Sequence, residues 1–214
     1  MATAGNDKAV MMQTGPTTTL GAAILAGGRA RRYGGADKSA LDCGDGRKIL
    51  QKLLDELAGA DLGDAIVCAN DPGPFEGLHL PVVADLRPDC GPLGGIAAAL
   101  THFRGRTDGT VLLACDLPGI SAVEIRALVQ AFRSGRDRVV VAATGDSLWH
   151  PLCSVVHNDV LPEVLAAVEA EEFAVGRLWR RLRAGEVRFD DETPFFNINT
   201  PEDLATWRER YGLW

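Results

Sequence analysis

Short apolar runs alternate with amphipathic segments along the chain, and this alternation constrains the fold more than any other feature of the sequence. Apolar runs bounded by turn residues are typical of buried strands, and amphipathic segments between them are typical of helices that cover a sheet. The runs predict strands at Leu20–Leu25, Asp64–Ala69, Val82–Ala84, Thr110–Ala114, Arg138–Ala142, Leu152–Val156 and Glu186–Phe189. The intervening segments predict helices at Lys48–Leu57, Leu93–Phe103, Ala122–Arg133, Asp159–Ala170, Ala174–Leu182 and Pro201–Arg210.

The order of these elements predicts an α/β protein with a three-layer α/β/α, Rossmann-like fold and a mostly parallel sheet. The chain has 214 residues, which is enough for one sizeable core, so we expect residues 19–214 to form a single domain. Residues 1–18 are polar and mixed, and we expect them to be a disordered amino-terminal extension. Ser121, three residues before Glu124, and Thr200, just before a proline, are expected to cap two helices.

Charge and cysteine usage exclude several classes of protein. A net charge of −7 argues against a surface that coats nucleic acid, and the absence of an apolar run of about 18 residues argues against a membrane span. The 5 cysteines contain no Cys-x-x-Cys pair, so neither a zinc site nor a disulfide framework is indicated. We therefore expect a cytoplasmic protein. A basic cluster at Arg177–Arg183 is interpreted as the exposed face of a helix.

The segment from Leu25 to Lys38 has the composition of a phosphate-binding loop. It follows a predicted buried strand and contains adjacent glycines, Gly27 and Gly28, whose backbone N–H groups can approach an anion closely. Its positive charges, which can neutralise a polyanion, are Arg29, Arg31, Arg32 and Lys38. A solvated basic turn is the alternative interpretation.

Two familiar phosphate motifs do not fit this segment. A P-loop ends in Gly-Lys-Ser or Gly-Lys-Thr, whereas Asp37 stands where the glycine before Lys38 is needed. A dinucleotide-binding loop needs the spacing Gly-x-Gly-x-x-Gly, which the adjacent pair Gly27 and Gly28 does not supply. A simple NAD-dependent oxidoreductase is therefore disfavoured.

Polar residues follow the next three predicted strands: Asn70, Asp85 and Asp116. In an open α/β sheet, ligands bind beyond the carboxyl ends of the strands, so we expect these side chains to share one edge with the glycine loop. Asp116 follows a fully apolar run, and Mg²⁺ prefers carboxylate oxygen together with substrate phosphates, so Asp116 is our predicted metal ligand. A turn-closing or helix-capping role is its alternative.

A second glycine-containing segment, Gly91-Pro92-Leu93-Gly94-Gly95, opens the predicted helix that begins at Leu93. Glycines there permit close backbone approach, and the amino end of a helix carries partial positive charge toward a bound anion. An ordinary connection between a loop and a helix, with no role in binding, explains the segment equally well. Asp85, a few residues earlier, is expected either to accept hydrogen bonds from a base or ribose or to be a surface carboxylate.

Taken together and in order, these motifs resemble those of the MobA-like nucleotidyltransferases, with a match that runs from about residue 20 to residue 205. The resemblance rests on five segments: Leu25-Ala26-Gly27-Gly28 through Lys38, Gly91 to Gly95, Cys115-Asp116-Leu117-Pro118, His150-Pro151-Leu152, and Asn197 to Leu204. It implies an enzyme that transfers GMP from GTP to the phosphate of molybdopterin, releases pyrophosphate and forms the guanine dinucleotide cofactor. It also implies Mg²⁺ as cofactor.

The resemblance further implies roles for single residues. Lys38, Asp116 and Arg32 would be catalytic, with Asp116 as the Mg²⁺ ligand. The nucleotide-binding set would be Leu25, Ala26, Gly27, Gly28, Arg29, Lys38, Asn70, Asp85, Gly91, Pro92 and Leu93. His150, Asn197 and Asn199 would bind the pterin substrate, although His150 could face solvent and Asn199 could instead cap the last helix.

Two other functions stay open from the sequence. A relative with the same fold could use CTP and form the cytosine dinucleotide, although such relatives tend to carry Leu-Ala-Ala-Gly where this chain has Leu-Ala-Gly-Gly at residues 25–28. A non-catalytic chaperone that binds GTP or the cofactor is the second. Expected partners are GTP, molybdopterin, and beyond them molybdoenzymes and cofactor-delivery proteins, with no nucleic acid and no membrane.

Overall fold

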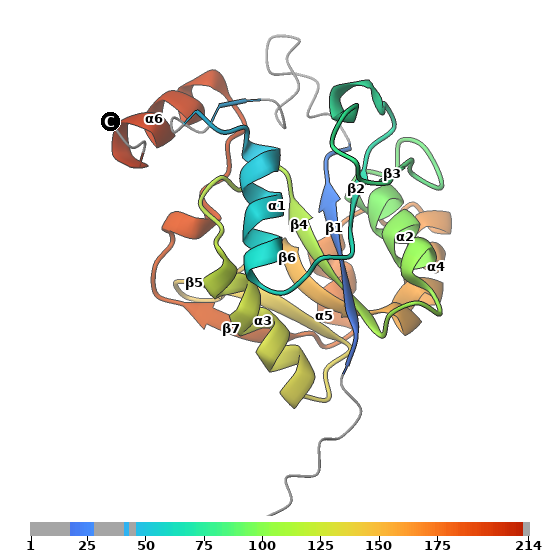
Figure 1. The fold of residues 1–214 in the computed structure, drawn as a ribbon. Helices are drawn as coiled ribbons and strands as arrows, with labels where there is room; N and C mark the ends of the chain where they lie inside the picture. The colour runs from blue at the N-terminus through green and yellow to red at the C-terminus, as the bar shows by residue number, and fades with distance from the viewer. Residues whose placement is uncertain (1–17, 28–40, 43–45, 212–214) are drawn as a thin grey trace, which may run out of the picture.

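A computed structural model describes residues 18–27, 41–42 and 46–211, and its centre is a seven-stranded sheet (Figure 1). The spatial order of the strands is β3-β2-β1-β4-β6-β5-β7. Their bounds are β1 Leu20–Leu25, β2 Ala65–Cys68, β3 Val82–Val83, β4 Gly109–Ala114, β5 Val139–Thr144, β6 Leu148–His157 and β7 Gly185–Phe189. All residues of β1, β2, β4 and β5 are buried, as expected of strands covered on both faces.

Pairing confirms the predicted mostly parallel sheet. Strand β1 lies parallel to both β2 and β4, β3 is parallel to β2, and β7 is parallel to β5. Only β6 runs against its neighbours, since it is antiparallel to both β4 and β5. The carboxyl ends of the six other strands therefore point to one edge of the sheet, which we call the carboxyl edge; it lies at the top in Figure 1. The opposite edge is the amino edge.

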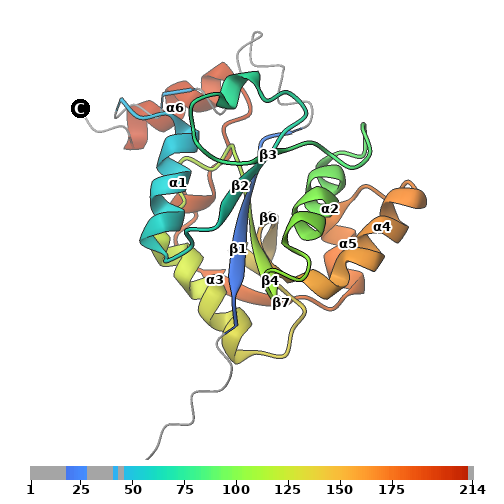
Figure 2. The same ribbon diagram turned by 45° about the vertical axis from the view of Figure 1, so that its right-hand side comes forward.

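Helices cover both faces of the sheet, as Figures 1 and 2 show. One apolar cluster joins one face to α1, α3 and α6, and a second cluster joins the other face to α2, α4 and α5. The α-helices are α1 Ile49–Gly59, α2 Pro92–Phe103, α3 Ala122–Ser134, α4 Leu161–Glu169, α5 Val175–Arg181 and α6 Pro201–Tyr211, and the short 3-10 turns are η3 Gly73–Phe75, η4 Asn158–Val160 and η5 Thr193–Phe195. The predicted three-layer class is confirmed.

Both predicted helix caps form. The Ser121 side chain accepts a hydrogen bond from a backbone N–H at the start of α3, and Glu124 accepts one from the Ser121 backbone N–H in return. At α6 the Thr200 hydroxyl accepts from the Asp203 backbone N–H at 3.1 Å, while the Asp203 carboxylate accepts from the Thr200 N–H at 2.8 Å. Local sequence signals therefore fixed these two helix starts.

Strand β6 and helix α4 depart from their predicted bounds. Strand β6 begins at Leu148 rather than Leu152, because Pro151 conceals a strand that continues past an irregularity. Helix α4 begins at Leu161 rather than Asp159, because a 3-10 turn precedes it. The expected extension over residues 1–18 lies outside the described residues apart from Thr18.

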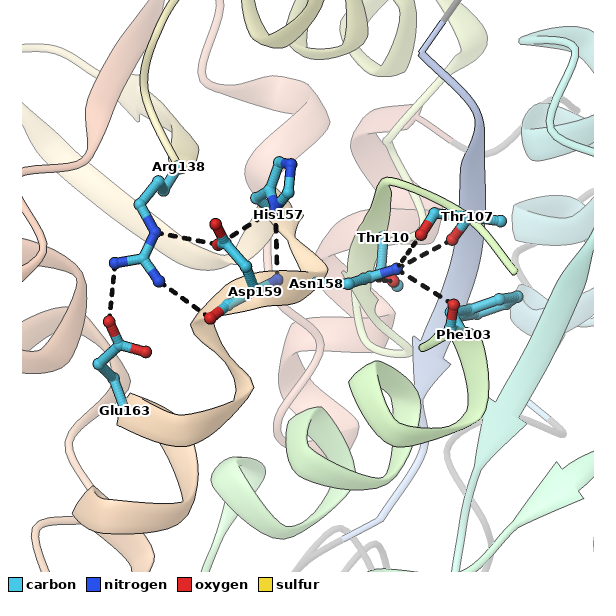
Figure 3. A network of polar contacts seen from close by, with 8 residues as sticks. All are labelled: Phe103, Thr107, Thr110, Arg138, His157, Asn158, Asp159 and Glu163. Atoms are coloured by element: carbon cyan, nitrogen blue, oxygen red, sulfur yellow. Dashed lines mark hydrogen bonds and ion pairs between the residues drawn. The ribbon is translucent and has the colours of Figure 1, made fainter. Parts of the chain in front are cut away.

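The amino edge is closed by a buried asparagine (Figure 3). Asn158 is 8% exposed and accepts a hydrogen bond from the Thr110 hydroxyl at 2.7 Å. Its amide nitrogen donates to the carbonyl oxygens of Thr107 at 2.8 Å and of Phe103 at 3.3 Å. These bonds tie the end of α2 and the start of β4 to the turn after β6, so the polar groups there are satisfied inside the protein.

An arginine extends this network toward α4 (Figure 3). Arg138 donates to the Asp159 carboxylate at 2.9 Å, to the Asp159 carbonyl oxygen at 3.0 Å, and to the Glu163 carboxylate at 2.7 Å. The Arg138 hydrogen bond holds the pKa of Glu163 below its ordinary value. The pairs are partly exposed, so each contributes little to the free energy of unfolding.

The structure also bears on the basic cluster, on two of the cysteines and on membrane-spanning helices. The arginines at 177, 180, 181 and 183 are exposed on or just after α5, as interpreted from the sequence. Burial raises the pKa of the Cys68 thiol and of the Cys153 thiol to about 12, so neither is a nucleophile at neutral pH. Among the described residues, no helix combines the length and the apolarity that crossing a membrane requires.

Candidate active site

Four segments meet at the carboxyl edge, because β1, β2, β3 and β4 are mutually parallel. Gly27 follows β1, Asn70 follows β2, Asp85 follows β3 and Asp116 follows β4. Backbone hydrogen bonds fasten the ends of the strands together, with Ala26 N–H donating to the Cys68 carbonyl oxygen at 2.9 Å. The polar residues that the sequence places after these strands therefore share one edge of the sheet.

The first strand end limits which backbone groups can meet a ligand. The Leu25 carbonyl oxygen accepts a hydrogen bond from the Cys115 N–H at 3.2 Å, and the Ala26 N–H is used by Cys68. Gly27 is the first residue of the loop beyond these bonds, and it is exposed. Among Leu25, Ala26 and Gly27 of the predicted nucleotide-binding set, Gly27 is the best placed to offer its backbone N–H to a ligand.

Asn70 and Asp85 form a reciprocal pair. The Asn70 side-chain nitrogen donates to the Asp85 carboxylate at 2.9 Å, and the Asp85 backbone N–H donates to the Asn70 side-chain oxygen at 2.9 Å. Asn70 is exposed and Asp85 is half-buried. Because each side chain fixes the other, the carboxylate of Asp85 is held in one orientation and keeps acceptor capacity for a ligand.

Glycines surround Asp85 closely. A Cβ added to Gly27 would lie 3.6 Å from the Asp85 Oδ1 atom, and one added to Gly95 would lie 3.4 Å from the same atom. A Cβ added to Gly94 would lie 3.1 Å from the Asp85 Cβ and Cγ atoms. The contact is tight only at the amino end of α2, where Gly94 lets the helix approach Asp85 closely, whereas a Cβ on Gly27 would make ordinary van der Waals contact.

The amino end of α2 contributes backbone rather than side chains. Gly91 has a φ of 57°, a left-handed conformation that favours glycine, and it stands just before the helix. Gly91 and Pro92 are exposed, whereas the Leu93 side chain is fully buried in the core. If Leu93 contacts a nucleotide as predicted, it does so only through its backbone.

Asp116 lies beside a distant segment of the chain. Its backbone carbonyl oxygen accepts a hydrogen bond from the Ile198 N–H at 3.0 Å, which places Asn197 and Asn199 next to the tip of β4. A Cβ on Gly119 would lie 2.7 Å from the Thr193 carbonyl oxygen, so the loop after Asp116 packs tightly against η5. The structure therefore brings together three predicted residues that are far apart in the sequence.

The two asparagines differ in their surroundings. The Asn197 side-chain nitrogen donates to the Phe195 carbonyl oxygen at 3.2 Å. The Asn199 backbone N–H donates to the Asp203 carboxylate at 2.8 Å, and Thr200 supplies the side-chain cap of α6. Helix capping therefore accounts for Thr200 and Asp203, and it does not require the side chain of Asn199.

His150 lies at the same edge. Strand β6 is antiparallel to β4, and Leu113 pairs with Cys153, so the beginning of β6 is level with the carboxyl end of β4. His150 is half-buried, its Nε2 atom is 2.9 Å from the Thr144 hydroxyl, and its ring stacks on Phe195 with centroids 4.6 Å apart. Burial lowers the pKa of His150, partly opposed by Glu192, so the ring is neutral at neutral pH.

Sequence reasoning missed Thr144 and Phe195. Thr144 ends β5 and is 1% exposed, and Phe195 belongs to η5 and is 3% exposed. A buried threonine at the end of a strand gives no distinctive pattern, and an aromatic residue after a proline is an ordinary core residue. Four predicted residues, Gly28, Arg29, Arg32 and Lys38, lie outside the described residues.

Similarity to known proteins shows the family of this chain. The family described as MobA-like NTP transferase domain matches residues 22–187. A molybdenum cofactor guanylyltransferase from Cereibacter sphaeroides is 35% identical over 184 residues, which cover 85% of this chain and 92% of that relative. The chain belongs to the MobA-like NTP transferase family. It is a nucleotidyltransferase, as its motifs predict.

Solved structures agree on the fold. Molybdopterin-guanine dinucleotide biosynthesis protein A from Archaeoglobus fulgidus superposes with a TM-score of 0.70 at 22% identity, covering 88% of this chain and 96% of that one. A Mycobacterium tuberculosis protein, Rv0371C, was solved in complex with manganese; it has a TM-score of 0.68 at 20% identity and covers 90% of this chain. These likenesses show that the chain has the fold of the two solved proteins.

The donor set of this chain suits a metal shared with a substrate. Among the described residues, no three His, Cys, Asp or Glu side chains gather into a group that could hold a metal ion. Asp116 offers a half-buried carboxylate whose Oδ1 atom is shielded from solvent. Mg²⁺ in phosphate-transfer sites is held by one or two carboxylates together with substrate phosphates, and this arrangement is compatible with Asp116.

Proposed function

We propose that this MobA-like enzyme transfers GMP from GTP to the phosphate of molybdopterin. A phosphate oxygen of molybdopterin forms a bond to the α-phosphorus of GTP, the bond from that phosphorus to the β-phosphate oxygen breaks, and pyrophosphate leaves. The product is the molybdopterin guanine dinucleotide cofactor. The observation that carries the proposal is the 35% identity, over 85% of the chain, to a molybdenum cofactor guanylyltransferase.

The nucleotide would lie along the carboxyl edge, between Gly27 and the amino end of α2. Asn70 and Asp85, fixed by their two 2.9 Å hydrogen bonds, would hold the nucleoside. Gly94 lets the amino end of α2 lie close to Asp85, which supports a nucleotide site between them. The partial positive charge at the amino end of α2 favours a bound anion, as does the backbone N–H of Gly27.

Phosphate transfer needs charge neutralisation and positioning rather than a covalent nucleophile. We assign the neutralising charges to Arg29, Arg32 and Lys38, which follow Gly28 in the sequence. Asp116 would hold Mg²⁺, which when bound neutralises charge on the triphosphate. The attacking phosphate is already ionised, so no side chain has to remove a proton from it.

The acceptor substrate would lie on the other side of Asp116. The hydrogen bond from the Ile198 N–H to the Asp116 carbonyl oxygen brings Asn197 and Asn199 near Asp116, and His150 stacks on Phe195 of the nearby turn η5; both contacts support this arrangement. We propose His150, Asn197 and Asn199 as contacts to the pterin. We also propose that the reaction takes place in the cytoplasm and that the product passes to molybdoenzymes or cofactor-delivery proteins.

The proposal is tested by pyrophosphate release from the full chain with GTP, CTP or UTP, each with Mg²⁺ and with or without molybdopterin. Release with GTP alone among the nucleotides, and only when molybdopterin is present, is the expected result. Preference for CTP would assign the chain to cytosine dinucleotide synthesis. Binding of GTP without pyrophosphate release would instead indicate a chaperone. Repeating the assay with Mn²⁺ in place of Mg²⁺ identifies the metal that supports the fastest turnover.

A further inference from the structure

Strand β6 changes its register against β5 just beside His150. Val141 pairs with Ser154, and a regular antiparallel pair would next join Ala142 to Cys153. Ala142 pairs instead with His150, so the residues from Pro151 to Cys153 have no counterpart on β5. A proline fits such an irregularity because it cannot supply a ladder hydrogen bond.

This irregularity reverses the face of the sheet to which each side chain at the beginning of β6 points. Successive side chains of a strand point to opposite faces, so an odd number of extra residues exchanges the two faces. Cys153 belongs to the apolar cluster under α1, α3 and α6, and in a regular strand His150 would face the other cluster. In this structure Trp149 packs against the other cluster, and His150 meets Phe195 of the first one. The register change therefore directs the His150 side chain toward Phe195.

Buried hydrogen bonds keep the irregularity in place. The Pro151 carbonyl oxygen accepts from the Trp179 indole N–H at 3.0 Å and from the Ser154 hydroxyl at 3.1 Å. Trp179 and Ser154 are both fully buried. A bulge held by buried donors is a fixed part of the fold, and bulges beside active sites commonly redirect a side chain.

Two further residues hold the imidazole ring of His150 in this direction. The Thr144 hydroxyl lies 2.9 Å from Nε2, and the Phe195 ring lies nearly parallel to the imidazole at an interplanar angle of 22°. Phe195 is itself fixed by Phe189, with ring centroids 5.0 Å apart. With Nε2 engaged by Thr144, the other ring nitrogen, Nδ1, is the one that a substrate group can use.

We propose that Thr144 and Phe195 are positioning residues that hold His150 so that Nδ1 contacts the acceptor substrate, molybdopterin. This inference rests on the proposed function and adds two residues that the sequence did not indicate. Neither residue touches the substrate; both act through the imidazole. They belong to the acceptor side of the site, so their loss should weaken use of molybdopterin and leave the binding of GTP unchanged.

The test compares Thr144→Val and Phe195→Leu with the wild type in three measurements: KM for molybdopterin, Kd for GTP, and Tm. Both variants should raise KM for molybdopterin about tenfold, as small displacements of a positioning group do, while Kd for GTP stays within about twofold. Thr144→Ser, which keeps the hydroxyl, should restore KM. Thr101→Val at an exposed site on α2 and Phe173→Leu against the opposite cluster are matched controls expected to leave KM unchanged.

Two results would overturn the inference: an unchanged KM in both variants, or a parallel loss of GTP binding and molybdopterin use that follows the fall in Tm. The proposed function is judged separately, by turnover of the wild type. If the wild type does not turn over, the same variants are compared by their affinity for molybdopterin, measured from pterin fluorescence. Unchanged affinity would then reject the roles of Thr144 and Phe195.

Discussion

The two edges of the sheet use polar residues in opposite ways. At the amino edge, Asn158 is buried and its side chain is bonded to Thr110, Thr107 and Phe103. At the carboxyl edge, Asn70 is exposed, and its partner Asp85 lies against the glycines at 94 and 95. The same residue type therefore closes the fold at one edge and prepares a ligand site at the other.

This contrast follows from what each edge has to do. Buried polar groups must be hydrogen-bonded, and the amino edge meets that requirement with groups from the protein itself. A binding site needs donors and acceptors that a ligand can complete, and glycines that admit it. Mutations at the amino edge should therefore change stability, whereas mutations at the carboxyl edge should change substrate use.

The largest effect is expected for Asp116→Ala at the carboxyl edge. Loss of the proposed metal ligand should lower kcat by about 10³-fold, equivalent to ~4 kcal/mol of transition-state stabilisation. The backbone carbonyl of Asp116 is kept in this variant, so its hydrogen bond from the Ile198 N–H should be retained. Steady-state kinetics and thermal unfolding are the measurements. Near-normal turnover would remove Asp116 from the metal site.

Asn158→Ala at the amino edge should lower stability and leave substrate use unchanged. It leaves the Thr110 hydroxyl and the Thr107 carbonyl oxygen without the Asn158 side chain, whereas the Phe103 carbonyl oxygen keeps the N–H groups of Arg106 and Thr107. The loss should lower the free energy of unfolding by ~2 kcal/mol. KM for GTP should not change. Asn70→Ala is the matched variant at the other edge, expected to raise KM for GTP while costing less than about 1 kcal/mol of stability. If both variants lost stability alone, the contrast between the edges would be wrong.

Gly94→Ala tests whether close packing around Asp85 matters. The added Cβ would lie 3.0 Å from the Arg87 carbonyl oxygen and 3.1 Å from Asp85 carbons, so Asp85 must shift by a few tenths of an ångström. We expect KM for GTP to rise about tenfold with little loss of stability, because alanine has the higher helix propensity. Gly63→Ala is the control, since a Cβ there meets nothing within 4 Å. Equal kinetics in the two variants would contradict the expectation.

The smallest effect is expected for Glu163→Gln, which removes one partner of Arg138 at the amino edge. The pair is partly exposed, so the loss should be below about 1 kcal/mol at pH 7. The folded protein holds the pKa of Glu163 below its ordinary value of 4.5, so the stabilisation is present above that pH and disappears as the pH falls through the lowered pKa. Unfolding at pH 7 and at pH 3 measures the difference. A difference that grows toward low pH would contradict the prediction.

Strong local signals made most of the fold predictable. Buried apolar runs located β1, β2 and β4, and capping residues located the starts of α3 and α6. The carboxyl-edge rule then placed Asn70, Asp85 and Asp116 together, because it depends only on parallel strand direction. The parts of the site that follow from topology could be inferred from sequence alone.

Other parts depend on packing that no local pattern encodes. The direction of His150 results from a register change at Pro151, and a regular strand would have pointed the side chain to the opposite face. The contacts of Thr144 and Phe195 with His150 join a strand end to a turn far along the chain. The roles of Arg32 and Lys38 stay predictions, because both residues lie outside the described part of the chain.

The hydrogen bond between Ile198 and Asp116 has a consequence for shortened forms of the protein. The family match ends at residue 187, yet the segment that packs on the tip of β4 comes after it, from Thr193 to Ile198. A chain ending at residue 190 would retain the residues of all seven strands but would lack that segment and α6. We therefore expect such a truncated protein to lack the proposed acceptor side of the site beside Asp116.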